Sequence, residues 1–419
     1  MLAGRRILLG LSGGIACYRS AELVRLLREA GAEVRCIMTR AAGKFITPLT
    51  MEALSGAPVG EALFSCTTDH RMGHIELARW ADLLVIAPAT ADLMAKLAAG
   101  VADDLLTTVA LVCERPLLLA PAMNRSMWQA AATQRNVARL RADGAHISGP
   151  EAGALACGEE GPGRMRTPSA LLEEIVTLCT PQRLRGSRWV VTTGPTWERW
   201  DDVRILTSRA SGRLGAHIAG EAARYGAEVT LIAGPGTPSV EGVDTRAVES
   251  AREMLRAALE ETAGGCDLFL AAAAVADYRV ARPHAGKLKR GTAEAPTLQL
   301  ERNPDIVATV AASGATRPRR VVAFAAEAVG DDPQTALAEG WRKLTAKQAD
   351  AIVVNDIADM GAAGHDRLWW LTAQDAPRPI TGGSKQATAR AIVQRILDQW
   401  PPCTEQHRDQ TDGIDHAAD

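Results

Sequence analysis

Short apolar runs alternate with amphipathic segments along most of this chain. The run Arg6–Leu11 is followed by a glycine-containing turn, an amphipathic segment that stops at Gly31, and a second apolar run over Glu33–Thr39. Continuous apolar strands separated by helices are typical of a parallel sheet that is covered on both faces. The pattern therefore predicts an α/β fold.

The pattern breaks once, at the polar stretch 181–187, and then starts again. A chain of 419 residues is long for one domain, so we predict two. The prediction is a doubly wound domain over 1–180, a linker over 181–187, a second doubly wound domain over 188–400 and a disordered tail over 401–419. Further strands are predicted at Asp82–Ala87, Pro116–Ala120, Ala145–Gly149, Arg188–Thr193, Glu228–Ala233, Asp267–Val275, Arg320–Ala325, Asp350–Val354 and Arg367–Thr372. Helices are predicted at Leu214–Tyr225, Ser250–Thr262 and Gln334–Lys347, with a last helix that ends near Trp400.

Composition narrows the class of protein. The formal net charge of −2 gives no reason to expect nucleic acid or a membrane surface as a partner. The eight cysteines are scattered without C-x-x-C or metal-ligand spacing, which favours a reducing cytosol and disfavours structural zinc. No signal peptide or membrane-length apolar run is visible, so we expect a cytoplasmic protein.

Two segments of the first half indicate a ligand site, and the first of them is suited to phosphate. Gly13 and Gly14 follow the first strand, where backbone N–H groups and a helix N-terminus attract phosphate. The segment 87–92, Ala-Pro-Ala-Thr-Ala-Asp, follows another strand at the same predicted edge. A full G-x-G-x-x-G motif is absent, which disfavours a nicotinamide dinucleotide. A tight turn and a helix capped by Thr90 or Asp92 are the alternatives without a ligand.

Three further segments, each predicted to be a loop, carry reactive groups. Met72–Leu77 contains His74, Pro121–Asn124 contains Asn124, and Ala156–Met165 contains Cys157. They offer an imidazole, a neutral amide donor and a thiol. Taken singly, they are more often a satisfied polar histidine, a helix cap and an inert buried cysteine than catalytic groups.

Together and in this order, these segments resemble the flavin-dependent phosphopantothenoylcysteine decarboxylases of coenzyme A biosynthesis. The resemblance implies a flavodoxin-like domain and a proton donor in Cys157. It further implies that Asn124 holds the substrate carboxylate and that His74 positions or deprotonates the substrate. The cofactor implied is non-covalent FMN, with these binding residues: Gly13, Gly14, Ile15, Thr39 and Thr90.

The second half lacks a P-loop motif, but polar groups follow several of its predicted strands. Lys287–Arg290 lies after a buried strand, where lysines are suited to holding phosphates. A solvated surface loop is the alternative for these residues, and a simple helix cap is the alternative for Asn303-Pro304-Asp305.

These segments resemble phosphopantothenate–cysteine ligase from about Arg188 to Trp400. The resemblance implies a Rossmann-like domain that uses CTP and Mg²⁺ to form an acyl-cytidylate. Asp277 is implied as the metal residue, Lys287 as the catalytic loop lysine, and Arg204 and Ser208 as acyl-cytidylate contacts. The implied CTP contacts are Ala271, Ala272, Ala273, Asp277, Lys287, Asn303, Pro304, Asp305, Ile306, Phe324, Lys343 and Lys347.

One segment, 204–213, departs from the ligase pattern. Ser208 stands where the family has asparagine, and Arg213 stands where it has lysine. A hydroxyl is shorter than an amide and has one proton fewer to donate, and losing one such hydrogen bond costs about 2–4 kcal/mol of barrier. A decarboxylase with an impaired ligase half is therefore one alternative, although Thr207 lies beside the position. A flavin-binding regulatory subunit is another.

The reading that we favour is a bifunctional enzyme of coenzyme A biosynthesis. Its expected partners are small molecules: 4'-phosphopantothenate, cysteine and CTP. The resemblance also implies a homo-oligomer in which trimeric decarboxylase units and dimeric ligase units close into a dodecamer.

Overall fold

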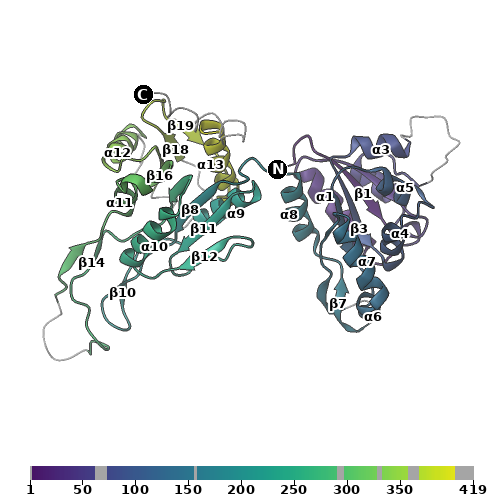
Figure 1. Cartoon of the computed structure of the whole chain (residues 1–419), viewed down its shortest axis with the longest axis horizontal. Helices are drawn as coiled ribbons and strands as arrows, with labels where there is room; N and C mark the ends of the chain where they lie inside the picture. The colour runs from purple at the N-terminus through teal and green to yellow at the C-terminus, as the bar shows by residue number, and fades with distance from the viewer. Residues whose placement is uncertain are drawn as a thin grey trace, which may run out of the picture. The chain divides into compact units, whose positions relative to one another are not determined.

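The computed structural model describes residues 2–61, 73–154, 158–289, 297–327, 333–356 and 368–401. The chain divides into two compact units, Met1–Thr180 and Pro181–Asp419, called here the N-terminal and C-terminal units (Figure 1). No helix in the described ranges is both long and apolar enough to cross a membrane. Cys157, Arg290 and residues 402–419 of the predicted tail lie outside the described residues.

The N-terminal unit is built on one five-stranded sheet, with all strands parallel, in the order β2-β1-β3-β4-β5. This is the strand order of flavodoxin, so the predicted flavodoxin-like fold is confirmed. The strands are β1 (Arg6–Leu11), β2 (Glu33–Met38), β3 (Leu83–Ala89), β4 (Leu117–Pro121) and β5 (His146–Ile147).

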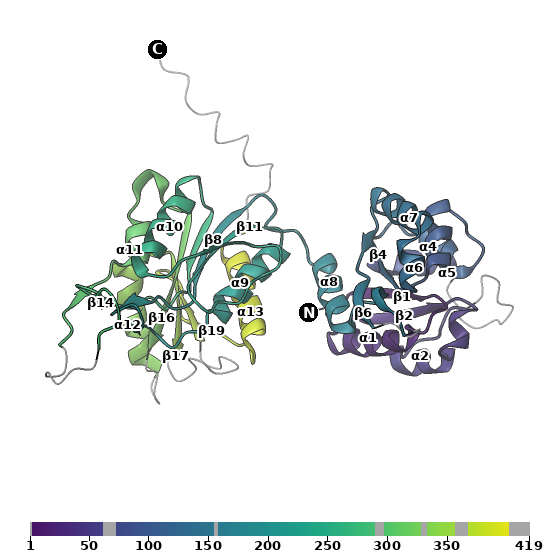
Figure 2. The ribbon, with the colours of Figure 1, turned by 90° about the horizontal axis from the view of Figure 1, so that it is seen from below.

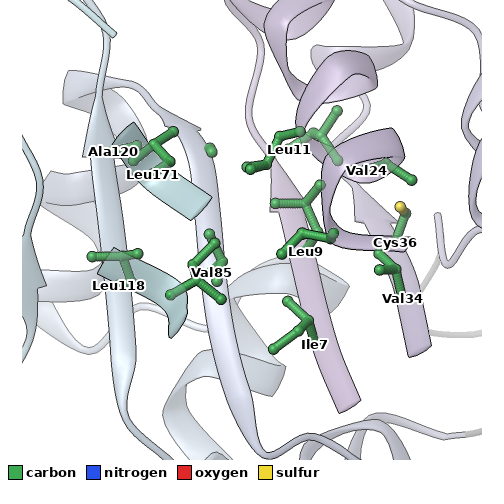
Figure 3. Packing of buried hydrophobic residues seen from close by; sticks show 14 of the residues in the cluster. Ile7, Leu9, Leu11, Val24, Val34, Cys36, Val85, Leu118, Ala120 and Leu171 are labelled. Carbon is green, nitrogen blue, oxygen red and sulfur yellow. The ribbon is translucent and has the colours of Figure 1, made fainter. Parts of the chain in front are cut away.

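Helices cover both faces of this sheet because alternate strand residues point to opposite sides. Ile7, Leu9 and Leu11 of β1 pack with the helices α1 and α8, as Figure 3 shows. Leu8 packs on the other face, with α3, α4, α5 and α7. The helices are α1 (Cys17–Glu29), α2 (Pro48–Ser55), α3 (His74–Trp80), α4 (Ala91–Ala99), α5 (Leu105–Val112), α6 (Arg125–Gln129), α7 (Ala131–Ala142) and α8 (Pro168–Cys179), with a short 3₁₀ turn η1 (Ala42–Lys44).

Two parts of this unit differ from the sequence prediction. His74 begins helix α3 rather than lying in a loop, with Gly73 as its N-cap. An antiparallel hairpin of β6 (Glu151–Ala154) and β7 (Glu160–Arg164) was not predicted. Its glycine and proline content is typical of a loop and hides the pairing from a sequence reading.

The C-terminal unit has an eight-stranded sheet in the order β12-β11-β8-β13-β16-β17-β18-β19. The six strands from β12 to β17 are parallel, and β18 and β19 add as an antiparallel edge. They are β8 (Arg188–Thr193), β11 (Glu228–Ala233), β12 (Asp244–Ala247), β13 (Leu268–Ala271), β16 (Arg320–Glu327), β17 (Ala351–Asp356), β18 (Leu368–Leu371) and β19 (Arg378–Ile380). Two small hairpins pair β9 (Glu198–Arg199) with β10 (Ile205–Leu206), and β14 (Tyr278–Val280) with β15 (Leu300–Arg302).

Two groups of helices cover this sheet from opposite faces (Figure 2). One group is α9 (Arg213–Arg224) with α13 (Lys385–Gln399), which pack against each other. The other group is α10 (Ala251–Ala263), α11 (Ile306–Ala311) and α12 (Pro333–Ala346), with the 3₁₀ turn η2 (Gly314–Thr316) nearby in sequence. The predicted doubly wound, Rossmann-like architecture is therefore confirmed.

Candidate active sites

The N-terminal unit contains a cavity of about 560 Å³ at the carboxyl edge of its sheet. This is where open α/β sheets bind ligands, and the volume is within the range of small-molecule sites. Loops after β1, β3 and β4 and the β6–β7 hairpin form it. The lining residues are Gly13, Gly14, Ile15, Ala16, Tyr18, Arg19, Thr90, Ala91, Ala122, Met123, Asn124, Met127, Ala154, Gly163, Arg164 and Met165.

Ser12 fastens two of these loops together. Its buried hydroxyl donates to the carbonyl of Pro88 at 2.8 Å and accepts from the backbone N–H of Thr90 at 2.9 Å. The loop after β1 is thereby fixed to the loop after β3. Ser12 was not among the predicted site residues, although its place directly after a buried strand was a usable signal.

Glycine is favoured at positions 13 and 14 for two different structural reasons. A Cβ on Gly13 would lie 2.3 Å from the Cβ of Ala41 and 2.9 Å from its carbonyl carbon, so the close packing admits no side chain. A Cβ on Gly14 would meet nothing closer than 3.5 Å, the Cγ2 of Thr90. Gly14 therefore keeps the backbone accessible from the cavity rather than fitting a tight contact.

The start of α1 is suited to the phosphate of FMN. Ala16 caps this helix without a side-chain hydrogen bond, and its first turn has no acidic residue. The N–H groups of Cys17 and Arg19 donate to the carbonyls of Gly14 and Ala16, so this helix end attracts anions through the positive end of its dipole. Gly13, Gly14, Ile15 and Thr90 of the predicted flavin set line the cavity, whereas Thr39 is not among the lining residues.

Asn124 lines the cavity and uses both ends of its amide. Its Oδ1 accepts from the backbone N–H of Ser126 at 2.7 Å, which makes it the N-cap of α6. Its Nδ2 donates to a carboxylate oxygen of Glu159 at 2.9 Å. The side chain is therefore a helix cap and, at the same time, a donor that already faces a carboxylate.

Of the two predicted residues that the structure describes, Asn124 lines the cavity of the N-terminal unit and His74 does not. His74 lies at the start of α3 and is not among the cavity-lining residues. The position of Cys157 is outside the described residues. Burial raises the pKa of each cysteine thiol that the structure describes, to about 12 for Cys36 and Cys266. These five thiols are free but suited to packing rather than to proton transfer.

The C-terminal unit contains a cavity of about 650 Å³, again at the carboxyl edge of its sheet. It reaches from the α11 and α12 side to the α9 and α13 side. The predicted CTP residues that line it are Ala271, Ala272, Ala273, Asp277, Asn303, Pro304, Asp305, Ile306, Phe324, Lys343 and Lys347. Segments that are far apart in the sequence thus converge on one site.

Asn303 and Asp305 also organise the rim of this cavity. Asn303 donates through Nδ2 to the carbonyl of Ala276 at 2.8 Å, which ties the loop after β15 to the loop after β13. Asp305 caps α11 by accepting from the backbone N–H of Ala308 at 3.0 Å. It also forms an ion pair with Lys347, and Lys343 forms one with Glu327. Both lysines on this side are therefore neutralised by carboxylates.

Asp277 is a suitable magnesium ligand. Its carboxylate is exposed at the cavity and has no hydrogen-bond or ion-pair partner among the described residues. A single carboxylate together with substrate phosphates is the usual way in which Mg²⁺ is held. No cluster of three metal-ligating side chains occurs in the described ranges, so the nucleotide would have to supply the other ligands.

Three predicted ligase residues are not among those that line this cavity: Arg204, Ser208 and Lys287. Ser208 lies at its edge, because its hydroxyl donates to the carbonyl of Ala274, a lining residue, at 3.0 Å. Lys287 is exposed on a loop that the turn around Asp201 holds by its backbone.

Three cationic lining residues were missed as site residues: Arg213, Arg302 and Lys385. Arg213 was noted only as a departure from the family pattern. Lys385 begins α13, directly after the N-cap Ser384, and the sequence Gly382-Gly383-Ser384 before it was a usable signal of a helix start.

Comparisons with known proteins agree with this division. Residues 1–180 match the flavoprotein family, and residues 184–399 match the C-terminal domain family of DNA/pantothenate metabolism flavoproteins. The coenzyme A biosynthesis bifunctional protein CoaBC of Vibrio cholerae is 45% identical over 405 residues, covering 95% of this chain and 99% of that protein. CoaBC of Escherichia coli K12 is 41% identical over 408 residues, covering 95% and 98%.

Two solved structures each match one unit. The FMN-dependent cysteine decarboxylase SpaF is 35% identical, with a TM-score of 0.37, and covers 43% of this chain and all of that one. The C-terminal domain of a CoaBC protein is 30% identical, with a TM-score of 0.43, and covers 52% of this chain and 97% of that one. The alternative of an impaired ligase half gains no support from these comparisons. Since relatives align along nearly their whole length, the chain belongs to the family of bifunctional coenzyme A biosynthesis proteins.

Proposed function

We propose that this chain catalyses two consecutive steps of coenzyme A biosynthesis. The C-terminal unit joins cysteine to 4'-phosphopantothenate with CTP and Mg²⁺, and the N-terminal unit decarboxylates the product to 4'-phosphopantetheine with FMN. The observation that carries the proposal is that one chain joins these two families, each with its own cavity at the carboxyl edge of its sheet.

In the ligase unit, the cavity holds CTP and the carboxylate of phosphopantothenate. The carboxylate displaces pyrophosphate from CTP to form an acyl-cytidylate, and the cysteine amine then displaces CMP. The backbone of Ala271–Ala273 and the rim residues Asn303 and Asp305 bind the nucleotide, with Asp277 on Mg²⁺. Lys287, Arg204 and Ser208 act at the acyl-cytidylate, and this requires the loop that carries Lys287 to reach the cavity.

In the decarboxylase unit, Asn124 binds the substrate carboxylate through Nδ2. A neutral donor orients this carboxylate without adding a charge that would stabilise it against loss. The contact of Glu159 with the same nitrogen supports this assignment, because it places a carboxylate oxygen there. When bound, FMN supplies a reversible two-electron acceptor, so the reaction needs no external oxidant. Cys157 returns a proton to the product, and His74 positions the substrate thiol.

We further propose a cytoplasmic homo-oligomer with trimeric decarboxylase units and dimeric ligase units, combining into a dodecamer. Large apolar side chains that line the N-terminal cavity are open to solvent, with Ile15 60% and Tyr18 62% exposed. A second copy that covers them would bury this surface and bring its own groups to the site. The position of His74 away from the cavity of its own unit agrees with a site completed in this way.

The test is a mass-spectrometric assay of the purified protein with FMN. One tube receives phosphopantothenate, CTP, Mg²⁺ and cysteine, and the other receives phosphopantothenoylcysteine. We expect phosphopantetheine in both tubes. Product in the second tube alone would limit the function to decarboxylation, and product in neither would refute the proposal.

A further inference from the structure

Two cations lie together on one side of the C-terminal cavity. Arg213 is the first residue of α9 and Lys385 is the first residue of α13, and these helices pack against each other on one face of the sheet (Figure 2). Both residues line the cavity. Within the part of the chain that the structure describes, neither side chain has a hydrogen-bond or ion-pair partner. The pair therefore presents uncompensated positive charge to the cavity.

The lysines on the opposite side of the cavity differ in this respect. Lys343 and Lys347 belong to the α12 side and are paired with Glu327 and Asp305. Those two lysines belong to the set already assigned to the nucleotide, whereas Arg213 and Lys385 have no assigned role. The paired lysines thus lie on a different side of the cavity from Arg213 and Lys385, and a further lining cation, Arg302, stands at the end of β15.

The placement of Arg213 and Lys385 is unfavourable in the absence of an anion. Burial and the charge of Arg213 both lower the pKa of Lys385, so the ammonium is destabilised where it stands. The first turn of a helix also carries positive partial charge and disfavours cations. Proteins usually keep positive charges in such unfavourable positions where a bound ligand compensates for the electrostatic cost.

We propose that Arg213 and Lys385 form a binding site for a phosphate group of a ligase substrate, on the α9 and α13 side of the cavity. The guanidinium offers paired donors to phosphate oxygens, and the ammonium adds a compact charge. Gly212, at φ +67°, caps α9 without a side chain, and Thr193 holds its carbonyl by a hydrogen bond of 2.8 Å. This rigid frame fixes Arg213 relative to the end of β8. The inference rests on the proposed ligase function.

Two substrates of that reaction carry phosphate: CTP and 4'-phosphopantothenate. Their contributions are separated by measuring KM for each in the full chain with Arg213→Gln and Lys385→Gln. Loss of a charged hydrogen bond is expected to raise the KM of the phosphate donor about 10- to 100-fold and to leave the other KM unchanged. A rise for phosphopantothenate assigns the site to that substrate, and a rise for CTP assigns it to the triphosphate. Unchanged KM values for both substrates would overturn the proposal.

Two control variants and two control measurements accompany these variants. Arg256→Gln removes a positive charge from the exposed side of α10, outside the cavity, and is expected to leave both KM values unchanged. Arg213→Lys keeps the charge and is expected to recover part of the lost affinity. Decarboxylation of supplied phosphopantothenoylcysteine reports that the N-terminal unit is intact, and thermal unfolding reports on the C-terminal unit.

A binding measurement separates this inference from the proposed function. Calorimetric titration with CTP, phosphopantothenate and unphosphorylated pantothenate needs no turnover. We expect the two Gln variants to lose affinity for one phosphorylated ligand and to bind pantothenate as the parent does. If the parent forms phosphopantothenoylcysteine while the variants bind every ligand normally, only the phosphate site is wrong. If the parent forms none, the proposed function itself fails.

Discussion

The buried carboxylate of Asp201 accepts a hydrogen bond of 3.1 Å from the backbone N–H of Leu288, 87 residues further along the chain. The same carboxylate accepts from the backbone N–H groups of Val203 and Arg204, and it forms an ion pair of 2.7 Å with the Arg204 guanidinium. Its neighbour Asp202 accepts from the N–H of Gly286 at 2.9 Å. Lys287 therefore lies between two backbone anchors that belong to one turn.

Asp201→Asn is expected to slow the ligase step. A neutral amide loses the charge that holds Arg204 and accepts hydrogen bonds less strongly, so the Lys287 loop is positioned less well. We expect kcat for phosphopantothenoylcysteine formation to fall at least about tenfold, with decarboxylation unchanged. Asp202→Asn weakens one contact of an exposed carboxylate and serves as the matched control. Equal ligase rates in the parent and the Asp201 variant would contradict this positioning role.

The same carboxylate predicts how stability depends on pH. Burial opposes its ionisation, but the three backbone N–H donors and Arg204 outweigh burial and lower its pKa from 3.8 to about 2. The folded state thus binds fewer protons than the unfolded state at this site, so the stabilisation is complete above about pH 5 and is lost as the pH falls towards 2. In urea unfolding of the C-terminal unit, the difference in free energy of unfolding between the parent and Asp201→Asn should shrink as the pH falls over that range. A difference that stays constant would show that Asp201 does not titrate as described.

The accuracy with which the sequence predicts strand bounds depends on the kind of strand. The bounds of β1, β8 and β11 match the prediction to the residue, because each is a mostly apolar run that a glycine follows within two residues. The run predicted as Asp267–Val275 fails for a physical reason. The strand β13 ends at Ala271, and the alanines after it form a loop that lines the cavity. Small apolar residues allow close approach of a ligand to the backbone, which hydrophobicity alone does not reveal.

Asn124→Asp separates the two roles of Asn124. Aspartate is an equally good N-cap, so the N–H of Ser126 keeps its partner and α6 should remain stable. The donor to the substrate carboxylate is lost, and a second carboxylate stands beside Glu159. We expect KM for phosphopantothenoylcysteine to rise about 100-fold while the thermal unfolding temperature of this unit barely moves.

Glu159→Gln is the companion experiment for the same contact. Removing the carboxylate that occupies Asn124 Nδ2 should lower KM for phosphopantothenoylcysteine roughly two- to fivefold, because the substrate no longer competes with a charged group. A raised KM in this variant would mean that Glu159 assists substrate binding instead.

Gly13→Ala and Gly14→Ala form a matched pair. The first places a methyl group 2.3 Å from the Cβ of Ala41 and is expected to destabilise the N-terminal unit by about 1–3 kcal/mol. The second meets no atom closer than 3.5 Å and should leave the fold intact. Thermal unfolding and flavin absorbance after purification give both readouts, and equal losses in the two variants would oppose the packing argument.

Ser208→Asn tests whether the departure from the family pattern matters. The Ser208 hydroxyl already makes one hydrogen bond, to the carbonyl of Ala274 at the edge of the cavity. Since the chain belongs to the bifunctional family, we expect the ligase kcat to change less than about tenfold. A near-silent parent that Ser208→Asn activates strongly would restore the alternative of an impaired ligase.

The site residues were harder to predict from the sequence than the strands were. Asn124 and Asn303 were selected because their segments resemble those of known families, and both residues line cavities. Ser12 and Lys385 were missed because their importance depends on which loops meet at a sheet edge. The topology of the fold decides which strand end lies beside which helix start when the two are far apart in the sequence. Local composition does not reveal this.

The central claim is that two separate cavities of one chain carry the two activities, and an assay of Asn124→Asp and Asn303→Ala, alone and mixed, tests it most directly. With phosphopantothenate, CTP, Mg²⁺ and cysteine, we expect the Asn124 variant to accumulate phosphopantothenoylcysteine and the Asn303 variant to form none. The Asn303 variant should still decarboxylate supplied phosphopantothenoylcysteine, and mixing the two proteins should restore phosphopantetheine. Loss of both activities in either variant, or no recovery on mixing, would contradict the account.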